Sequence, residues 1–417
     1  MPEFFNVLPP DEARRLLFEH ITLPVRSEMW PTVDSLGRVT VEPTFAPQAL
    51  PSFRRSTMDG YAVRAEDTYG ASETLPVVLT VMSEVEMGKA SLFPIGKYSA
   101  AVVHTGGMIP DVADAVVQIE HTQQVDPANS IRFPFEIEVF KAVAVGQNVL
   151  QVGEDVEQGT QVIPGRHYLR AQDLGGLLAL GITEIMVARR PRVAIIATGD
   201  EVVEPGADPG PGEIRDINSY TVAGQTRNAG GIPMLFGIIP DNFAVLKEAA
   251  EKAIEENDMV VMSAGSSVSV RDMTVKVMEE LGEPGVLLHG VATRPGKPTI
   301  IGVAAGKPLI GLPGNPVSAM IQFFMFGTPT IYRLQGLLRP PRQGIVWARI
   351  SANIASESGR EDYVPAKLED SVEGLMAKPV FGKSNLIYTL VNADGLIKVP
   401  LNSGGLEAGD WVEVHLF

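Results

Sequence analysis

The residues best suited to chemistry are grouped in four short loops, each directly after an apolar run. The loops are "TGDE" (198–201), "AGSSVSVRD" (264–272), "RPGKP" (294–298) and "LPGNPVS" (312–318). Each loop combines Gly or Pro with charged or hydroxyl side chains. Because ligands of open parallel sheets bind outside the carboxyl ends of the strands, we expect the four loops to converge on one cleft.

The charged residues of these loops are of two kinds. Glu201 and Asp272 supply carboxylates, and oxygen ligands of this kind suit Mg²⁺, a hard cation. Arg294 and Lys297 lie around a Pro-Gly turn and suit a phosphate or another oxyanion. Magnesium between carboxylates and a phosphate ester is a common arrangement in phosphoryl and nucleotidyl transfer. The loops therefore predict chemistry of that class.

The segment "GLPGNPVS" (311–318) joins an apolar run to an apolar helical pattern. Asn315 is a good N-cap and Pro316 a good first helical residue, which explains this pair in structural terms. Ser318 then falls in the first turn, where backbone N–H groups are free and the helix dipole favours an anion. We expect the segment to aim a helix start and the Ser318 hydroxyl at the anion that the cationic loop binds.

Each motif also has a purely structural explanation. Gly-Asp in "TGDE" is a common turn, and Asp272 is explained equally well as a helix cap. "FRRSTMDGYAVR" (53–64) fits a basic-flanked hairpin turn, and "HTGGMIPDVADAVVQIE" (104–120) fits a Thr-Gly-Gly turn before a strand. The functional interpretation therefore depends on the loops taken together.

The elements that must position the loops are apolar strands alternating with amphipathic helices. This pattern is typical of a mostly parallel, doubly wound α/β sheet. Residues 45–150 and 340–417, including 386–400, contain short runs between Gly and Pro turns and indicate β-rich modules. The expected α/β strands are 192–198, 233–239, 259–264, 285–292, 299–304 and 308–312, and the expected helices are 218–229, 243–257, 273–281 and one after Pro316.

Composition excludes several classes of protein. The chain of 417 residues has a formal net charge of −16, which argues against duplex nucleic acid as a partner, although a few cations in one cleft suffice for a small anion. The absence of cysteine removes disulfides, thiolate metal sites and cysteine nucleophiles, and it fits a reducing cytosol. Neither a signal-peptide pattern nor a membrane span is evident, so we expect a cytoplasmic protein.

Eight motifs follow one another along the chain: "RSTMDGYAV", "HTGGMIPDVADAVVQIE", "GEDV", "ATGDEV", "IRDINSY", "SSVSVRD", "RPGKP" and "GLPGNPVSA". In this order they resemble the MoeA-type molybdopterin molybdenumtransferases, a family that includes the C-terminal domain of gephyrin. The resemblance extends over roughly residues 10–417. It implies an elongated homodimer, with each active cleft between the α/β domain of one subunit and the β-rich module of the other.

The resemblance also implies four domains in each subunit. An elongated linking domain is formed by residues 1–45 and 150–187, and the β-rich module, residues 46–149, is inserted within it. The molybdopterin-binding α/β domain covers residues 188–336, and a β-barrel-like C-terminal domain covers residues 340–417. Asp59 of the inserted module is then expected to complete a site in the other subunit.

The implied reaction is a step of molybdenum cofactor biosynthesis. Molybdate is joined to the dithiolene of adenylylated molybdopterin with Mg²⁺ as cofactor, AMP is released and molybdenum cofactor is formed. An upstream adenylyltransferase and downstream molybdoenzymes are the implied partners, with neither nucleic acid nor a membrane among them. The loops fit this reaction, because molybdate is a tetrahedral dianion and the other substrate contains a pyrophosphate bridge.

The motifs carry the functional residues of the family onto positions of this chain. Glu201 and Asp272 are the expected Mg²⁺ ligands, mostly through water. Arg360 and Ser384, in the C-terminal domain, are expected to close over the oxyanion. The expected catalytic residues are Asp59, Thr105, Asp155, Glu201, Asp216, Asp272 and Lys297. The expected substrate-binding residues are Ser267, Arg294, Lys297, Pro313, Gly314, Asn315, Pro316, Ser318, Arg360 and Ser384.

Three positions depart from the family pattern. Ala264 stands where the family has the first of two glycines, Ser269 replaces a later glycine of the same loop, and Arg294 replaces the commoner Lys. These departures leave the choice between molybdate and tungstate open. They also leave open a non-catalytic molybdopterin carrier or sensor and, less favoured, a gephyrin-like scaffold. The retained carboxylates favour the enzyme, because a carrier has no need of a Mg²⁺ site.

Overall fold

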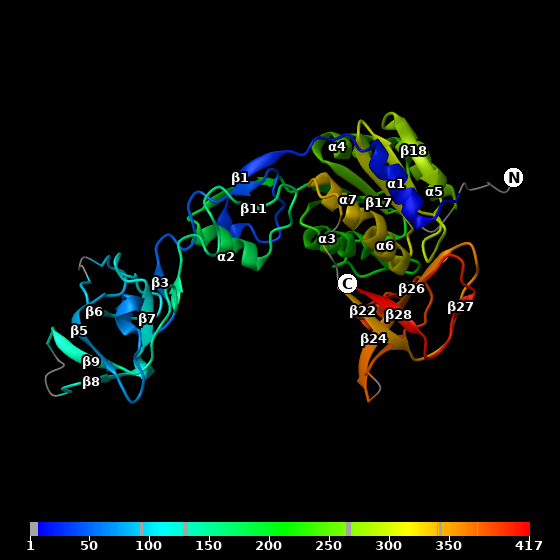
Figure 1. Cartoon of the computed structure of the whole chain (residues 1–417). Helices are drawn as coiled ribbons and strands as arrows, with labels where there is room; N and C mark the ends of the chain where they lie inside the picture. Colours follow the sequence, from blue (N-terminus) through cyan, green and yellow to red (C-terminus); the bar gives the residue numbers. More distant parts are fainter. Residues whose placement is uncertain are drawn as a thin grey trace.

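The computed structural model describes residues 7–91, 95–127, 132–263, 268–339, 341, 344–372 and 374–417. Figure 1 shows an elongated molecule, with a β-rich module at one end and an α/β sheet beside a C-terminal β-barrel at the other. A narrower region that contains α2 (Ala171–Ala179) lies between them. We propose the four-domain division given above for these parts. In the described residues, no helix is long and apolar enough to cross a bilayer.

The α/β domain is built on a six-stranded sheet with the order β16-β13-β17-β21-β20-β18. β13 runs parallel to β16 and β17, and β17 runs parallel to β21, whereas β20 is antiparallel to both β21 and β18. The predicted mostly parallel sheet is therefore confirmed. The strands are β13 (Arg192–Thr198), β16 (Ile232–Ile239), β17 (Met259–Ser263), β18 (Pro284–His289), β20 (Ile300–Ala304) and β21 (Lys307–Leu312).

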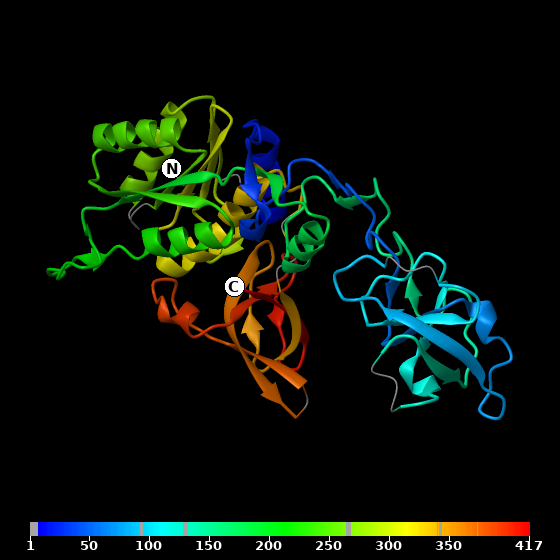
Figure 2. The same cartoon turned by 90° about the vertical axis from the view of Figure 1, so that its left-hand side faces the viewer.

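Alternate strand residues of this sheet face two separate cores. Ile195 and Val261 belong to the core covered by α1, α3, α6 and α7, whereas Ile196 and Val260 belong to the core covered by α4 and α5. Figure 2 shows helices on both sides of the sheet. Because both faces are covered, the central strands β13, β17 and β21 are apolar apart from residues at their ends. The helices are α1 (Pro10–His20), α3 (Asn218–Asn228), α4 (Phe243–Glu256), α5 (Val268–Glu280), α6 (Pro316–Gln322) and α7 (Thr328–Leu334).

The strand register brings the starts of the four loops to one edge of the sheet. β13 and β17 end level with each other, and Ser263 of β17 pairs with Leu312 of β21. Ile300, the first residue of β20, pairs with Gly311 of β21 and with His289 of β18. This edge is the carboxyl edge of the parallel strands, where ligands of open α/β sheets bind.

The β-rich module carries its own six-stranded sheet, with the order β7-β4-β6-β5-β9-β8. In β5, buried and exposed residues alternate along the second half of the strand, as expected for a sheet with one solvated face. The strands are β4 (Gly60–Val63), β5 (Val77–Glu84), β6 (Ser99–Val103), β7 (Ala115–Gln118), β8 (Thr122–Gln124) and β9 (Phe135–Val139).

Short antiparallel ladders connect this module to the rest of the chain. Each ladder pairs a segment that precedes this six-stranded sheet with one that follows it, so the chain enters and leaves side by side. Gly181 closes α2 with a φ of +75°, the left-handed conformation that suits glycine at a helix end. The ladders are β1 (Ser27–Pro31) with β12 (Glu184–Ala188), β2 (Thr44–Phe45) with β11 (Gln161–Ile163), and β3 (Arg55–Ser56) with β10 (Val149–Leu150).

The C-terminal domain is a closed five-stranded barrel, because β24 pairs with both β25 and β26. The predicted β-barrel is confirmed, but residues 386–400 are not β throughout: α8 (Tyr388–Val391) precedes β26. A two-residue strand of the α/β domain, β19 (Thr293–Arg294), runs parallel to β24 and extends the barrel sheet. The barrel strands are β22 (Ile345–Ile350), β24 (Glu361–Ser371), β25 (Gly374–Pro379), β26 (Gly395–Val399) and β28 (Trp411–Leu416).

Candidate active site

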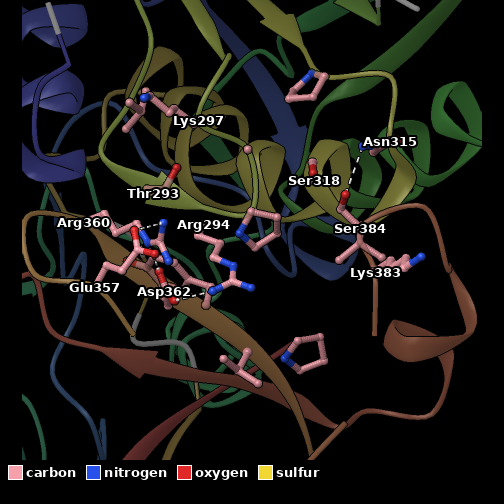
Figure 3. Close-up of a pocket in the computed structure, with 18 of the residues that line it drawn as sticks. Thr293, Arg294, Lys297, Asn315, Ser318, Glu357, Arg360, Asp362, Lys383 and Ser384 are labelled. Atoms are coloured by element: carbon pink, nitrogen blue, oxygen red, sulfur yellow. Dashed lines mark hydrogen bonds and ion pairs between the residues drawn. The ribbon is translucent and has the colours of Figure 1, made fainter. Parts of the chain in front are cut away.

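A cavity of about 1080 Å³ lies between the α/β domain and the C-terminal barrel, and we call it the cationic cavity. Its described lining contains four cationic and two acidic side chains. Figure 3 shows that these side chains come from both domains and that Ser318 faces the same space from α6. The cations are Arg294, Lys297, Arg360 and Lys383, and the acidic residues are Glu357 and Asp362.

The carboxylate of Asp362 holds two of these cations in position. Asp362 is 2% exposed. Its Oδ1 accepts a hydrogen bond from Nε of Arg360 at 2.9 Å, and its Oδ2 lies 3.7 Å from a terminal nitrogen of Arg294. Arg360 also bonds Glu357 at 2.8 Å. The side chain of Arg294 remains 62% exposed, so most of its five N–H donors stay available to a ligand.

The cationic loop, residues 294–298, is held against α6 by Gln322. The fully buried amide of Gln322 donates to Oγ1 of Thr293 at 3.0 Å and to the carbonyl of Pro295 at 2.9 Å. Gly296 has a φ of +101°, and a Cβ at this position would lie 2.4 Å from Gln322. A glycine is therefore required here, and the close packing fixes the backbone that carries Lys297.

The start of α6 is organised differently from the sequence-based expectation. Asn315 occupies the N-cap position as expected, but its side chain makes no capping hydrogen bond. Its Nδ2 donates to Oγ of Ser384 at 3.0 Å, and the backbone N–H of Val317 donates to the carbonyl of Ser384 at 3.1 Å. Pro316 is the first helical residue as expected, and Ser318 is buried in the first turn and lines the cationic cavity.

A second cavity, of about 550 Å³, adjoins the first, and we call it the acidic cavity. Asn315 and Asn385 line both cavities. Glu201, Glu213 and Asp216 contribute carboxylates to the acidic cavity, which Gly314 and Pro316 also line. Acidic and cationic side chains therefore occupy neighbouring spaces on opposite sides of the α6 start.

The "TGDE" loop uses its acidic residues in different ways. Thr198 Oγ1 donates to Asp241 at 2.7 Å, and the Asp241 N–H donates to Asp200 at 3.1 Å, so these carboxylates brace the loop. Gly199 has a φ of +145°, and a Cβ there would lie 2.8 Å from Oε2 of Glu201. Glycine therefore allows the Glu201 side chain to fold back over the loop beside the acidic cavity.

Asp216 and its neighbour Asn218 tie α3 to the sheet edge. Oδ1 of Asp216 accepts a hydrogen bond from the N–H of Ser219 at 3.0 Å, which is the geometry of a helix cap. Nδ2 of Asn218 donates to Oγ of Ser263 and to the carbonyl of Gly314, each at 2.9 Å. Asn218 therefore connects the start of α3 to two of the strand-end segments that surround the cavities.

The donor set of the acidic cavity fits a Mg²⁺ ion that is shared with a phosphate substrate. In the part of the chain that the structure describes, no group of three or more His, Asp or Glu side chains lies together as a metal site. Glu201, Glu213 and Asp216 nevertheless line one space. Mg²⁺ usually keeps several waters and binds one or two carboxylates together with substrate phosphates.

Asp272 lies in the second turn of α5 (Val268–Glu280), so it is not the N-cap of that helix. It is absent from the described linings of both cavities. Ser267 and Ala264 lie outside the described residues, as does the side chain of Ser269. The structure therefore leaves the expected roles of Asp272 and Ser267 as predictions.

Asp59, Thr105 and Asp155 are not brought to the cavities within one subunit. They belong to the β-rich module and its connection to the linking domain, at the other end of the molecule (Figures 1 and 2). Oδ1 of Asp59 accepts hydrogen bonds from the N–H and hydroxyl of Thr105, at 2.8 and 3.3 Å. The N–H of exposed Asp155 donates to the carbonyl of Leu50 at 3.0 Å.

Tyr363, which lines the cationic cavity, is a hydrogen-bond donor at neutral pH. Its hydroxyl donates to Oε2 of Glu361 at 2.7 Å, and Lys398 binds the other oxygen of that carboxylate at 2.7 Å. Burial, followed by the charge of Glu361, raises the pKa of Tyr363. Burial and nearby acidic side chains likewise raise the pKa of Tyr220 on α3.

Sequence reasoning missed four residues that shape the site: Asn218, Gln322, Asp362 and Lys383. Gln322 carried a usable signal, because it is a polar residue inside the apolar helical run "AMIQFFMF". Asp362 and Lys383 stand next to the expected residues Arg360 and Ser384 but gave no pattern of their own. Their roles arise from contacts between distant segments.

Three family models match successive parts of the chain. The MoeA N-terminal region (domain I and II) matches residues 8–181, and the probable molybdopterin binding domain matches residues 194–333. The MoeA C-terminal region (domain IV) matches residues 348–417. Together the matches follow the order of the sheets described above.

Individual relatives are similar over nearly the whole chain. The molybdopterin molybdenumtransferase of Bacillus subtilis is 33% identical, covering 98% of this chain and 94% of that protein. The protein of the same name from Haemophilus influenzae is 30% identical, with 99% of each covered. The crystal structure of the molybdopterin biosynthesis moeA protein from Pyrococcus horikoshii OT3 superposes with a TM-score of 0.84 at 31% identity, covering 99% of this chain and 100% of that chain. The motifs, the fold and these similarities agree that the chain belongs to the MoeA family.

Proposed function

We propose that this protein is a molybdopterin molybdenumtransferase, which joins molybdate to the dithiolene of adenylylated molybdopterin and releases AMP. The observation that carries the proposal is the pair of adjoining cavities, one cationic and one acidic, that share Asn315 and Asn385. The relatives in Bacillus subtilis and Haemophilus influenzae carry this enzyme name. No observation favours the carrier, the sensor, the scaffold or a tungstate preference.

The cationic cavity is the proposed site of the oxyanion and the dithiolene. Planar guanidinium groups present paired N–H donors, and a lysine adds a compact charge, so Arg294, Arg360 and Lys297 together suit a tetrahedral dianion. The hydroxyls of Ser318 and Ser384 are further proposed donors. The cavity, at about 1080 Å³, is larger than a single oxyanion requires, which leaves space for the pterin substrate. The proposed wall toward the acidic cavity is Pro313, Gly314, Asn315 and Pro316.

The acidic cavity is the proposed site of the pyrophosphate bridge. Glu201 and Asp216 line it, and Asp272 is proposed to reach it from α5. When bound there, Mg²⁺ supplies positive charge that offsets the phosphate oxygens as AMP leaves. The carboxylates of the chain hold and orient that ion, while the cationic cavity keeps the dithiolene end in place.

We propose that two subunits form a homodimer with shared clefts. Asp59 and Thr105 lie far from both cavities of their own chain, and the Asp59 side chain is 63% exposed. The N–H and hydroxyl of Thr105 fix the direction of its carboxylate. An ordered, exposed carboxylate of this kind suits the completion of a cleft in another subunit, and exposed Asp155 is proposed to contribute as well.

The proposed reaction also implies a cellular location and enzymes that act before and after this one. We propose a cytoplasmic location, because the relatives are named for cofactor biosynthesis. An upstream adenylyltransferase would supply the adenylylated substrate, and downstream molybdoenzymes would receive the product.

AMP release from adenylylated molybdopterin, measured with molybdate and Mg²⁺, tests the proposal. The wild-type protein is expected to release AMP at least about 10²-fold faster than Glu201→Ala, because that carboxylate supports the reacting phosphates. Glu248→Ala, which removes an exposed carboxylate of α4, is the matched control and is expected to keep the wild-type rate. Equally slow release by the wild type and Glu201→Ala would show that the protein is not this enzyme.

A further inference from the structure

A third cavity, of about 460 Å³, lies where the linking domain meets the α/β domain, and we call it the joint cavity. Arg192, Ile232 and Lys307, the first residues of β13, β16 and β21, line it. It therefore lies at the amino edge of the parallel strands, opposite the edge that bears the other two cavities. Two chain segments that connect the domains, residues 21–26 and 189–191, pass along it.

The joint cavity carries an excess of positive charge. Its described lining contains six cationic and four acidic side chains, in a chain whose formal net charge is −16. The excess of two equals that of the cationic cavity, for which an anionic substrate is proposed. The cations are Arg26, Arg38, Arg189, Arg190, Arg192 and Lys307, and the acidic residues are Glu28, Glu255, Glu256 and Asp258.

Among the residues that the structure describes, four of these arginines have no carboxylate partner. In the described chain, no carboxylate lies within ion-pair distance of Arg26, Arg189, Arg190 or Arg192. The N–H of Arg189 donates to the carbonyl of Arg26 at 2.8 Å, so these two arginines stand opposite each other on neighbouring segments. Like charges placed opposite each other destabilise a pair of strands. An uncompensated cluster of this kind is typical of a functional site.

Two of the four acidic side chains of the lining already accept hydrogen bonds from other groups of the chain. Oε1 of Glu28 accepts a hydrogen bond from Arg38 at 2.5 Å. Oδ2 of Asp258 accepts one from the backbone N–H of Arg192 at 2.8 Å, which leaves the guanidinium group of that arginine free to turn toward the cavity. The carboxylates of the lining therefore do not neutralise all of the positive charge of the joint cavity.

Two buried side chains of the lining also carry unsatisfied polar atoms. Arg38 is 1% exposed and lies 4.7 Å from the centre of the Trp30 ring, and its Nε has no hydrogen-bond partner. Asn257 is 2% exposed; its amide donates to a backbone carbonyl of α4, and its Oδ1 has no partner. The unpaired N–H of Arg38 is a buried donor beside the cavity and points to an anionic ligand there, whereas the unpaired oxygen of Asn257 is an acceptor and lends an anion no support.

We propose that the joint cavity binds a small phosphorylated anion with at least two phosphoryl groups. Clustered guanidinium groups match phosphate oxygens in geometry and charge. Such an anion would bridge Arg26 and Arg189 of the connecting segments to Arg192 of the sheet. Binding would thereby stiffen the joint between the linking domain and the α/β domain. The site is separate from the molybdenum chemistry and does not depend on it.

Titration calorimetry with inorganic pyrophosphate in Mg²⁺-free buffer tests the site, because the proposed pyrophosphate site of the acidic cavity requires Mg²⁺. Lys297→Ala is used to weaken binding in the cationic cavity, and this variant is expected to retain pyrophosphate binding. Adding Arg189→Gln and Arg190→Gln to Lys297→Ala is expected to weaken the remaining binding at least tenfold. Lys276→Gln, which removes an exposed unpaired cation of α5, is the matched control and leaves binding unchanged. Equal affinity with and without the two arginine substitutions would overturn the proposal, as would complete loss of binding in Lys297→Ala alone.

A second measurement separates a lost site from a misfolded protein. Arg189→Gln/Arg190→Gln in the otherwise wild-type chain is expected to keep molybdate binding, which would show that this variant folds. The same two substitutions added to Lys297→Ala are expected to abolish the rise in unfolding temperature that pyrophosphate causes in Lys297→Ala. Arg190→Lys, which preserves the charge, is expected to bind pyrophosphate more tightly than Arg190→Gln. If Arg190→Lys and Arg190→Gln bind pyrophosphate equally tightly, the charge of this side chain has no role and the site is not the one proposed.

Discussion

Nδ2 of Asn315 donates a hydrogen bond to Oγ of Ser384 at 3.0 Å, and this contact joins the start of α6 to the C-terminal domain. Both side chains line the cationic cavity, and Asn315 also lines the acidic cavity. The pair therefore stands at the boundary between the proposed oxyanion site and the proposed pyrophosphate site.

Asn315→Ala is expected to raise the KM for adenylylated molybdopterin several-fold, because the segment around Ser384 loses its side-chain contact with α6. One hydrogen bond of this kind stabilises a protein by about 1 kcal/mol, so the unfolding temperature should change little. Steady-state AMP release measures the effect, and Asn392→Ala, at an exposed position after α8, is the matched control. If Asn315→Ala keeps the wild-type KM, the contact between Asn315 and Ser384 does not contribute to substrate binding.

Lys297→Ala is expected to weaken molybdate binding by roughly 10- to 100-fold, because a hydrogen bond to a charged group contributes about 1.5–3 kcal/mol. The Lys297 side chain is exposed in the cationic cavity, so its removal should leave the fold intact. Titration calorimetry with molybdate measures the change, with Lys276→Ala as the control. Unchanged molybdate affinity would contradict the oxyanion assignment.

Mixed dimers test whether Asp59 acts in the cleft of the other subunit. Asp59→Asn and Lys297→Ala homodimers are each expected to be inactive. Random exchange of equal amounts should yield about one quarter of the wild-type activity, because half of the dimers are mixed and each mixed dimer has one intact cleft. AMP release after subunit exchange measures this recovery. If the mixture stays inactive although exchange is complete, Asp59 does not act in trans.

Asp362→Asn is expected to destabilise the protein by about 2 kcal/mol, because the hydrogen bond that Arg360 donates to this buried carboxylate loses its negative acceptor. The same substitution leaves Arg294 less constrained, so the KM for molybdate should rise. Calorimetric unfolding and AMP release measure the two effects. Asp370→Asn, on the exposed end of β24, is the control, and an equal loss of stability there would show that Asp362 has no special role.

Asp173 in α2 makes stability depend on pH in the acid range. Burial alone would raise the pKa of this carboxyl, but hydrogen bonds from Arg170 and His167 outweigh burial and hold it well below its usual range. The stabilisation is therefore fully present above the unfolded pKa of about 3.9 and declines as the pH falls below it. Asp173→Asn should lower the unfolding temperature near neutral pH. The difference in unfolding temperature between the wild type and this variant should shrink toward about pH 3. Calorimetry that finds a constant difference would contradict this account.

Much of the fold follows from local patterns in the sequence. The continuous apolar runs predicted β13, β17 and β21, because a strand buried on both faces has no polar alternation. Amphipathic spacing likewise predicted α4, and the Asn242 cap before it is present. The segment of α8 was mistaken for β structure, because four residues are too few to show a helical period.

The arrangement of the site depended on contacts that no local pattern encodes. The side chain of Asn315 fits an N-cap by local rules, yet Ser384, far along the chain, takes its hydrogen bond. Asp362 of the barrel pairs with Arg360 and also with Arg294 of the α/β domain, and the second contact requires the barrel to dock against that domain. Motif resemblance named Arg360 and Ser384 as site residues, but it contained nothing about Gln322 or Lys383.

The parallel pairing of β19 with β24 has a consequence for how the protein can be divided. Arg294 belongs to the α/β domain by sequence, but its backbone is a strand of the barrel sheet. A fragment that ends before residue 340 would contain the cationic loop but would lack β24, the strand with which the start of that loop pairs. The α/β domain and the barrel therefore have to be kept together in any shortened or chimeric protein, because the proposed active site lies across the border between them.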